Sequence, residues 1–196
     1  MKLLIATNNK GKQKEFARIL GGVNYQLVYP TDVSLADFDV DETGSTAKEN
    51  AYLKAEAFAK KTGLLTVADD SGLEIAALDG APGIHSKRFH LGEDTDRNQK
   101  VFELMEGIES PEDRKALFRS VLCLYDPQSE QTDYFEGIFD GYISKEEKGS
   151  EGFGYDPIFI PKEETKTIAQ LGIEYKNEHS HRAIAINKLM TFLKDL

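Results

Sequence analysis

The segment Leu64-Leu65-Thr66-Val67-Ala68 is followed directly by Asp69-Asp70-Ser71-Gly72. The first five residues are almost all apolar and predict a buried strand. The next four predict an acidic turn at the carboxyl end of that strand, where open α/β sheets bind their ligands. Two carboxylates and a hydroxyl at this place are typical of a site, but an ordinary solvated loop would read the same. The rest of the sequence has to decide between the two.

Strands and helices alternate in the first half of the chain, and a long hairpin follows in the second half. This order predicts an α/β fold with a mixed sheet. Thr46 and Glu49 form a capping box that starts one helix, and Gly63 ends it. The expected strands are 2–6, 25–29, 64–68, 116–125 and 132–143, and the other expected helices are about 12–20, about 96–105 and one that begins after Ser180.

The composition is that of a globular protein with a single domain over residues 1–196. The net charge of −10 argues against nucleic acid or an anionic membrane as a partner. Cys123 is the only cysteine, which excludes a disulfide framework and fits a reducing cytosol. The start of the chain does not resemble a signal peptide, and no apolar run approaches the roughly 20 residues of a membrane helix. We therefore expect a cytoplasmic protein.

A basic segment lies between the first strand and the first helix. Backbone N–H groups at a helix start, together with lysines and small polar side chains, are suited to binding phosphate. An ordinary turn with solvated lysines would have the same composition, and the glycine spacing of a Walker motif is missing. The candidate anion-binding residues are Thr7, Asn8, Asn9, Lys10, Gly11 and Lys12.

Acidic residues occur in two places that could act together. Asp41 and Glu42 precede the second helix, where carboxylates often serve only to cap it. Alongside Asp69-Asp70 they could supply the few oxygen ligands that Mg²⁺ takes when phosphates and water complete its shell. The sequence does not say which of Asp41 and Glu42 is the ligand.

Two further segments predict contacts with a planar ligand. Gly152-Phe153-Gly154-Tyr155-Asp156-Pro157 combines two glycines with two aromatic rings on which a base could stack. A tight turn with core aromatics would look the same. Ser180-His181-Arg182, with Lys176 nearby, offers donors for base carbonyls or phosphates, although His and Arg are often incidental in the first turn of a helix.

Taken together, the segments resemble the inosine triphosphatase (HAM1) family of pyrophosphatases, which act on non-standard purine nucleoside triphosphates. The resemblance runs in family order from residue 5 to residue 182, and the set is specific although each piece alone is weak. The matching pieces are Ile5 to Asn9 with Lys12 and Glu15, Glu42 to Gly44, Glu49 to Ala51, Lys54-Ala55, Ala68 to Leu73, Ala81 to Gly83, Gly152 to Phe159 and Ser180 to Arg182.

The resemblance implies hydrolysis of ITP, dITP and XTP to the monophosphate and pyrophosphate, with Mg²⁺, in a homodimer. It also implies an elongated mixed sheet with flanking helices, which form two lobes around a central substrate cleft. Asp70 would be the general base and a metal ligand, with the second ligand at Asp41 or Glu42. Residues 7–12 would bind the phosphates. The remaining substrate contacts would be Ser71, Phe153, Gly154, Tyr155, Asp156, Lys176, His181 and Arg182.

The chain departs from the bacterial pattern after Pro82-Gly83. It has Ser86-Lys87-Arg88 where Ser-Ala-Arg is usual, and His85 replaces a frequent tyrosine, so Lys87 could add a phosphate contact. Two alternatives remain open at this stage. One is a Maf-type pyrophosphatase acting on other modified nucleotides, and the other is a protein that binds purine nucleotides without catalysis. A Ca²⁺-binding module is disfavoured because the loop spacing of its oxygen ligands is missing.

Overall fold

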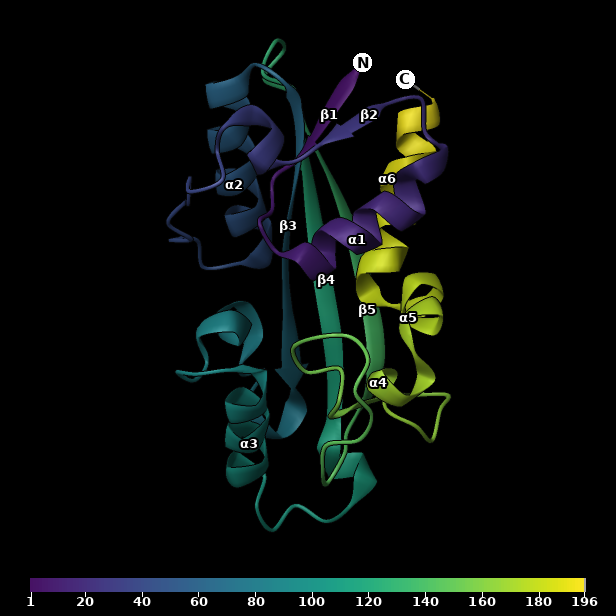
Figure 1. Cartoon of the computed structure of the whole chain (residues 1–196). Coiled ribbons are helices and arrows are strands. Elements are labelled where there is room, and N and C mark those ends of the chain that lie inside the picture. The colour runs from purple at the N-terminus through teal and green to yellow at the C-terminus, as the bar shows by residue number, and fades with distance from the viewer. Residues whose placement is uncertain (196) are drawn as a thin grey trace. The chain divides into compact units, whose positions relative to one another are not determined.

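The computed structural model describes residues 1–195 and has a six-stranded mixed sheet with helices packed against it (Figure 1). The predicted α/β class with a mixed sheet is thus confirmed. The strands are β1 (Lys2–Ile5), β2 (Gln26–Val28), β3 (Leu65–Ile75), β4 (Lys115–Tyr125), β5 (Thr132–Ile143) and β6 (Phe159–Pro161). The helices are α1 (Lys10–Ile19), α2 (Ala47–Thr62), α3 (Asp94–Leu104), α4 (Ile168–Leu171), α5 (Ile173–His179) and α6 (His181–Lys194).

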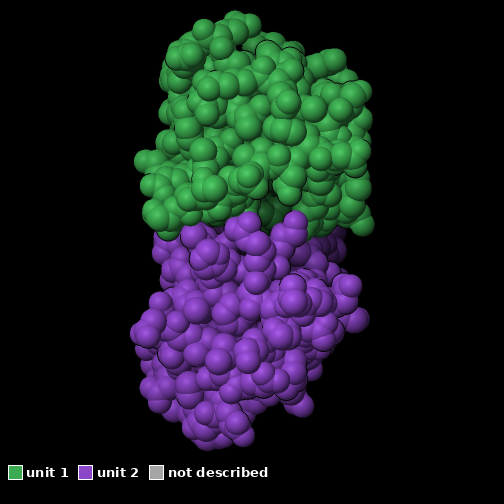
Figure 2. All heavy atoms as spheres, turned by 90° about the vertical axis from the view of Figure 1, so that its left-hand side faces the viewer, with its two compact units in different colours: residues 1–70, 120–137, 182–196 green, residues 71–119, 138–181 purple. Residues whose placement is uncertain are grey.

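The chain forms two compact units, coloured separately in Figure 2. Unit 1 comprises residues 1–70, 120–137 and 182–196, and unit 2 comprises residues 71–119 and 138–181. Strands β3, β4 and β5 each contribute residues to both units. Neither unit is one continuous stretch of sequence.

In unit 1 the strands are ordered β2-β1-β3-β4-β5, and β1 pairs in parallel with both β2 and β3. Alternate residues of each strand face opposite sides of the sheet. One side, with Ile5 and Val67, packs against α1 and α6, and the other, with Leu4 and Ala68, packs against α2. The apolar stripes of these three helices therefore account for both buried faces.

In unit 2 the strand order is β3-β4-β5-β6, and β5 and β6 are antiparallel. Its core joins Leu73 and Ile75 of β3 to Val101 of α3 and to Met105, which directly follows that helix, with Phe159 of β6 also buried in the cluster. The glycine-containing loop at 149–156 contributes a tyrosine to the same core.

The largest difference from the sequence prediction concerns Asp69-Asp70-Ser71-Gly72. These residues do not form a turn, because β3 continues through them to Ile75. The prediction assumed that adjacent carboxylates end a buried strand, but cationic side chains compensate them here. Position 72 requires a glycine, because the Cβ of any other residue there would lie only 2.1 Å from the carbonyl oxygen of Gly83.

Smaller differences concern short elements and boundaries. α1 begins at Lys10 rather than near Lys12, and α3 begins at Asp94 rather than near Asp96. The predicted segment 73–78 divides into the end of β3 and a 3-10 turn at Ala76–Leu78. β6, α4 and α5 were not predicted, because they have too few residues to show a clear periodicity. Among residues 1–195, no helix has the length and apolar character needed to cross a membrane.

Candidate active site

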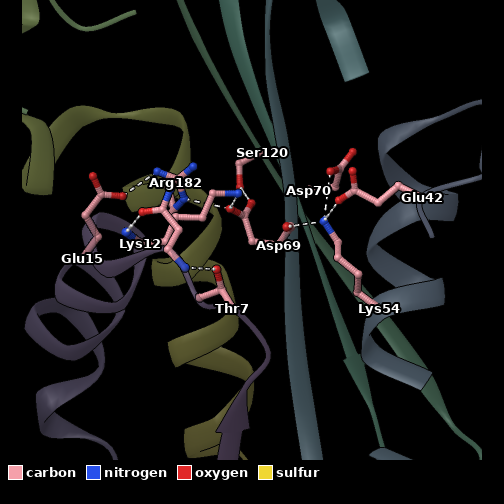
Figure 3. Close-up of polar contacts among 10 residues, drawn as sticks. Thr7, Lys12, Glu15, Glu42, Lys54, Asp69, Asp70, Ser120 and Arg182 are labelled. Carbon is pink, nitrogen blue, oxygen red and sulfur yellow. Dashed lines mark hydrogen bonds and ion pairs between the residues drawn. The ribbon is translucent and has the colours of Figure 1, made fainter. Parts of the chain in front are cut away.

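The alternation of β3 places its two adjacent aspartates on opposite faces of the sheet in unit 1. Figure 3 shows Asp69 directed toward Lys12 and Arg182, and Asp70 directed toward Lys54. Both carboxylates are buried, with residue exposures of 3% and 5%. They therefore have the same chemistry and burial, and they differ in their partners.

Asp69 is the centre of a compensated network. Its Oδ2 lies 2.7 Å from the Lys12 ammonium and 2.9 Å from Nε of Arg182, and its Oδ1 accepts a 2.6 Å hydrogen bond from Ser120. Arg182 also contacts Glu15, at 2.5 Å. Burial acts to raise the pKa of Asp69, but the two cations outweigh it and hold that pKa well below its usual value. Asp69 therefore stays ionised near neutral pH.

Asp70 has a different balance. Its Oδ1 lies 3.1 Å from the Lys54 ammonium, and Oδ2 is buried with no hydrogen-bond partner among residues 1–195. Burial raises the pKa of Asp70 above its usual value, and Lys54 offsets this only in part. Its carboxylate therefore keeps one oxygen available for a ligand or a proton.

Lys54 joins the acidic residues on this face of the sheet. Its ammonium lies 2.6 Å from Oε1 of Glu42 and donates to the Asp69 carbonyl at 3.0 Å. Burial alone lowers the pKa of Lys54, but Asp70 and Glu42 more than offset this and raise it. The sequence alone does not assign a role to Lys54, although its place one turn after Glu49-Asn50 on the predicted helix is a usable signal.

The residues present fit a divalent cation. The partnerless Oδ2 of Asp70 and the neighbouring Glu42 are hard oxygen donors, whereas Asp41 is exposed. Among residues 1–195, no group of three or more His, Cys, Asp and Glu side chains could hold a metal. Substrate phosphates and water would have to complete the shell of ligands.

The basic segment forms the start of α1. Asn9 caps the helix by accepting the Lys12 N–H at 3.1 Å, and Thr7 accepts the Asn9 N–H at 3.2 Å. Asn8 donates to the Ala36 carbonyl, and the Lys10 ammonium contacts Gln13. Residues 7–12 thus lie at a helix N-terminus, whose dipole favours anions.

In unit 2, Asp156 organises the glycine-containing loop. Its Oδ2 accepts the Phe153 N–H at 2.8 Å and lies 2.6 Å from the Lys176 ammonium. Both side chains of that ion pair are 2% exposed, and the ammonium lies 3.7 Å from the centre of the Phe153 ring. The structure therefore brings together three of the residues predicted for base binding.

Three other predicted contacts have structural partners. Tyr155 is buried in the core of unit 2, and its hydroxyl donates to the Ser86 carbonyl at 2.8 Å. His181 is buried and stacks on Phe118 with ring centres 4.7 Å apart. Arg182 belongs to unit 1, where Glu15 and Asp69 hold its guanidinium. Ser71 is half-buried within β3, and Lys87 and His85 are exposed.

Lysines and carboxylates gather around β3 in this mixed α/β fold, an arrangement that is compatible with an enzyme acting on phosphorylated substrates. The particular family follows from comparison with known proteins. The chain belongs to the Ham1 family, whose model matches residues 3–192. Nucleotide pyrophosphatases such as these generally need a divalent metal.

Curated relatives cover almost the whole chain. It is 45% identical to the dITP/XTP pyrophosphatase of Porphyromonas gingivalis over 98% of this chain and 97% of that protein. It is 44% identical to the dITP/XTP pyrophosphatase of Bacillus subtilis over 97% of this chain and 96% of that protein. The solved HAM1 protein of Coxiella burnetii superposes with a TM-score of 0.91 at 38% identity, with 100% of each chain covered.

Proposed function

We propose that this protein hydrolyses non-standard purine nucleoside triphosphates, namely ITP, dITP and XTP or dXTP, to the monophosphate and pyrophosphate. Such an activity removes deaminated purines from the nucleotide pool. The support is the family membership together with relatives of 44–46% identity named dITP/XTP pyrophosphatase. A Maf-type enzyme is not favoured, because the matching family model is Ham1. Because the relatives are named as enzymes, a protein that only binds nucleotides is not favoured either.

The observation that carries the mechanism is the arrangement around Asp70. A buried carboxylate with one partnerless oxygen and a raised pKa is suited to accept a proton from an attacking water. The water attacks the α-phosphorus, the bond to the leaving pyrophosphate breaks, and Asp70 takes the proton. We propose Asp70 as the general base.

We propose Mg²⁺ as the metal, held by Asp70 and Glu42 with the substrate's own oxygens. When bound, the ion would offset phosphate charge and lower the pKa of the attacking water. Asp41 is the less suitable ligand because its side chain is exposed. The Lys54 ammonium contacts both carboxylates, at 2.6 Å for Glu42 and 3.1 Å for Asp70, and so holds them near each other.

The phosphates are assigned to the start of α1 and the base to the loop of unit 2. Thr7, Asn8, Asn9, Lys10, Gly11 and Lys12 supply donors and positive charge, as polyphosphate binding requires. We propose that Phe153 stacks on the base and that the Lys176–Asp156 pair recognises its polar edge, with Ser71, Gly154, Tyr155 and His181 as further contacts. A protein N–H facing position 6 can donate to the 6-oxo oxygen of a deaminated purine, whereas it would face a second donor in the 6-amino group of adenine.

An assay of pyrophosphate and orthophosphate release tests this proposal. Purified protein with Mg²⁺ is given dITP, XTP, dATP and dGTP in parallel. We expect pyrophosphate alone as the inorganic product, with dITP and XTP turned over at least about tenfold better in kcat/KM, because an unpaired buried polar group costs about 1–3 kcal/mol. Orthophosphate release, or equal use of dATP, would contradict the proposal.

We further propose a cytoplasmic homodimer built from a single domain over residues 1–196. The reduced, buried Cys123 fits a reducing compartment. Light scattering after gel filtration is expected to give twice the mass of one chain. A monomer at micromolar concentration would contradict the dimer.

A further inference from the structure

Helix α3 contacts the loop that carries Phe153, although none of its residues has been assigned a role. Asp94, at the start of α3, accepts the backbone N–H of Gly154 through Oδ2 at 2.6 Å. Asn98, one turn later, donates from Nδ2 to the Gly154 carbonyl at 3.3 Å and to Oε1 of Glu147 at 2.7 Å. Both polar groups of one glycine are therefore held by one helix, and all these residues belong to unit 2.

This double contact fixes the backbone on both sides of Gly154. Its N–H belongs to the peptide plane shared with Phe153, and its carbonyl belongs to the plane shared with Tyr155. Gly154 has a positive φ of 64°, a backbone conformation that residues with a side chain rarely adopt. The preceding peptide plane is fixed too, because Asp156 accepts the Phe153 N–H at 2.8 Å. Both peptide planes that flank Phe153 are thus held by aspartates, which fixes the direction in which its side chain leaves the backbone.

The two residues of α3 are themselves held in place. Asn98 is 1% exposed, and Asp94 is paired with Arg97, which also donates to the Gly92 carbonyl at 2.7 Å. Asp96 caps the same helix by accepting the Glu93 N–H at 2.8 Å. The start of α3 is therefore held by several polar contacts of its own, and the loop is attached to it by two hydrogen bonds, of which the one to Asp94 has a charged acceptor.

We propose that Asp94 and Asn98 are positioning residues that hold Gly154 and thereby set the Phe153 ring for purine binding. This inference rests on the proposed function, in which Phe153 stacks on the base. In this proposal α3 contributes to base affinity through the loop that carries Phe153, without contacting the nucleotide. The groups proposed for bond cleavage belong to unit 1, so loss of this contact should weaken binding more than chemistry.

The test compares Asp94→Ala with Asp96→Ala. Each variant removes one aspartate from the first turn of α3, but only the first removes the acceptor of the Gly154 N–H. We expect the KM for dITP to rise roughly tenfold in Asp94→Ala with kcat within about twofold, in line with loss of a hydrogen bond to a charged group. Asp96→Ala should keep the wild-type KM even where its melting temperature falls. An unchanged KM in Asp94→Ala, or an equal rise in both variants, would overturn the proposal.

A second measurement needs no substrate. Amide hydrogen exchange of Gly154, followed by NMR in the whole protein, should accelerate about tenfold or more in Asp94→Ala and stay as in the wild type in Asp96→Ala. Asn98→Ala should also accelerate it, by a smaller factor, because it frees only the carbonyl side. Equal exchange in all four proteins would overturn the role of α3. A wild type that releases no pyrophosphate from dITP would instead refute the proposed function, and the exchange data would still decide the positioning.

Discussion

The two faces of β3 in unit 1 give opposite environments to neighbouring residues of the same type. Asp69 faces α1 and α6 and meets two cations and a hydroxyl, so its charge is fully compensated. Asp70 faces α2, shares one cation with Glu42, and keeps one buried oxygen without a partner. The pKa of the first is lowered and that of the second is raised.

This difference separates a structural anion from a reactive one. A buried carboxylate with enough cations around it holds its neighbours in place and does not titrate near neutral pH. An undercompensated carboxylate costs stability but is available to a metal or a proton. Substitutions on either side of the strand should therefore have different consequences.

The largest expected effect is the loss of turnover in Asp70→Asn. An amide cannot accept the proton from water, so kcat should fall by about a thousandfold or more. Pyrophosphate release from dITP measures the loss, and circular dichroism should show an unchanged fold. The exposed Asp37 provides a control in Asp37→Asn, which should retain full activity. Near-normal turnover in Asp70→Asn would remove it as the base.

On the other face, Asp69→Asn should mainly destabilise the protein. It leaves Lys12 and Arg182 with an uncompensated positive charge, and breaking such a buried pair costs about 3–5 kcal/mol. The free energy of unfolding from urea titration should fall accordingly. If stability is unchanged while activity is lost, the two faces do not differ as described.

The next largest effect distinguishes Asp41 from Glu42 as the metal ligand. In Glu42→Gln the Mg²⁺ concentration for half-maximal activity should rise about tenfold or more, because loss of a metal ligand, or of a group that orients one, weakens metal binding by at least that factor. In Asp41→Asn it should stay within about twofold, because that side chain is exposed. The reverse result would make Asp41 the ligand.

The smallest effect concerns the direction in which the free energy of unfolding of the metal-free protein changes with pH. The lowered pKa of Asp69 contributes stability above the unfolded-state pKa of about 3.9, and this is lost as pH falls through the folded-state value. The raised pKa of Asp70 has the opposite sign: its contribution is lost as pH rises through the folded-state value. At pH 7 with a chelator, Asp70→Asn should therefore be more stable than the wild type, by about 1 kcal/mol or less. A less stable variant would contradict the undercompensated charge of Asp70.

The sequence predicted the long elements well, because their patterns are local. The capping box of Thr46 and Glu49 and the glycine at 63 define α2 correctly, and the hairpin strands were placed within a residue. It also singled out Asp70 and the segment Phe153–Asp156. It did not reveal the contact of Lys54 with Asp70 or that of Asp94 with Gly154. The residues of these two pairs are 16 and 60 positions apart in the sequence.

The sequence by itself determined that two adjacent carboxylates follow an apolar run, and that alternation along a strand separates neighbouring side chains. It could not determine that the strand continues through them. Only the tertiary structure decided that, because Lys12 and Arg182 on one side and Lys54 on the other come from α1, α6 and α2. A buried charge is stable only beside its compensating partners, and those partners are brought to β3 by the packing of distant helices.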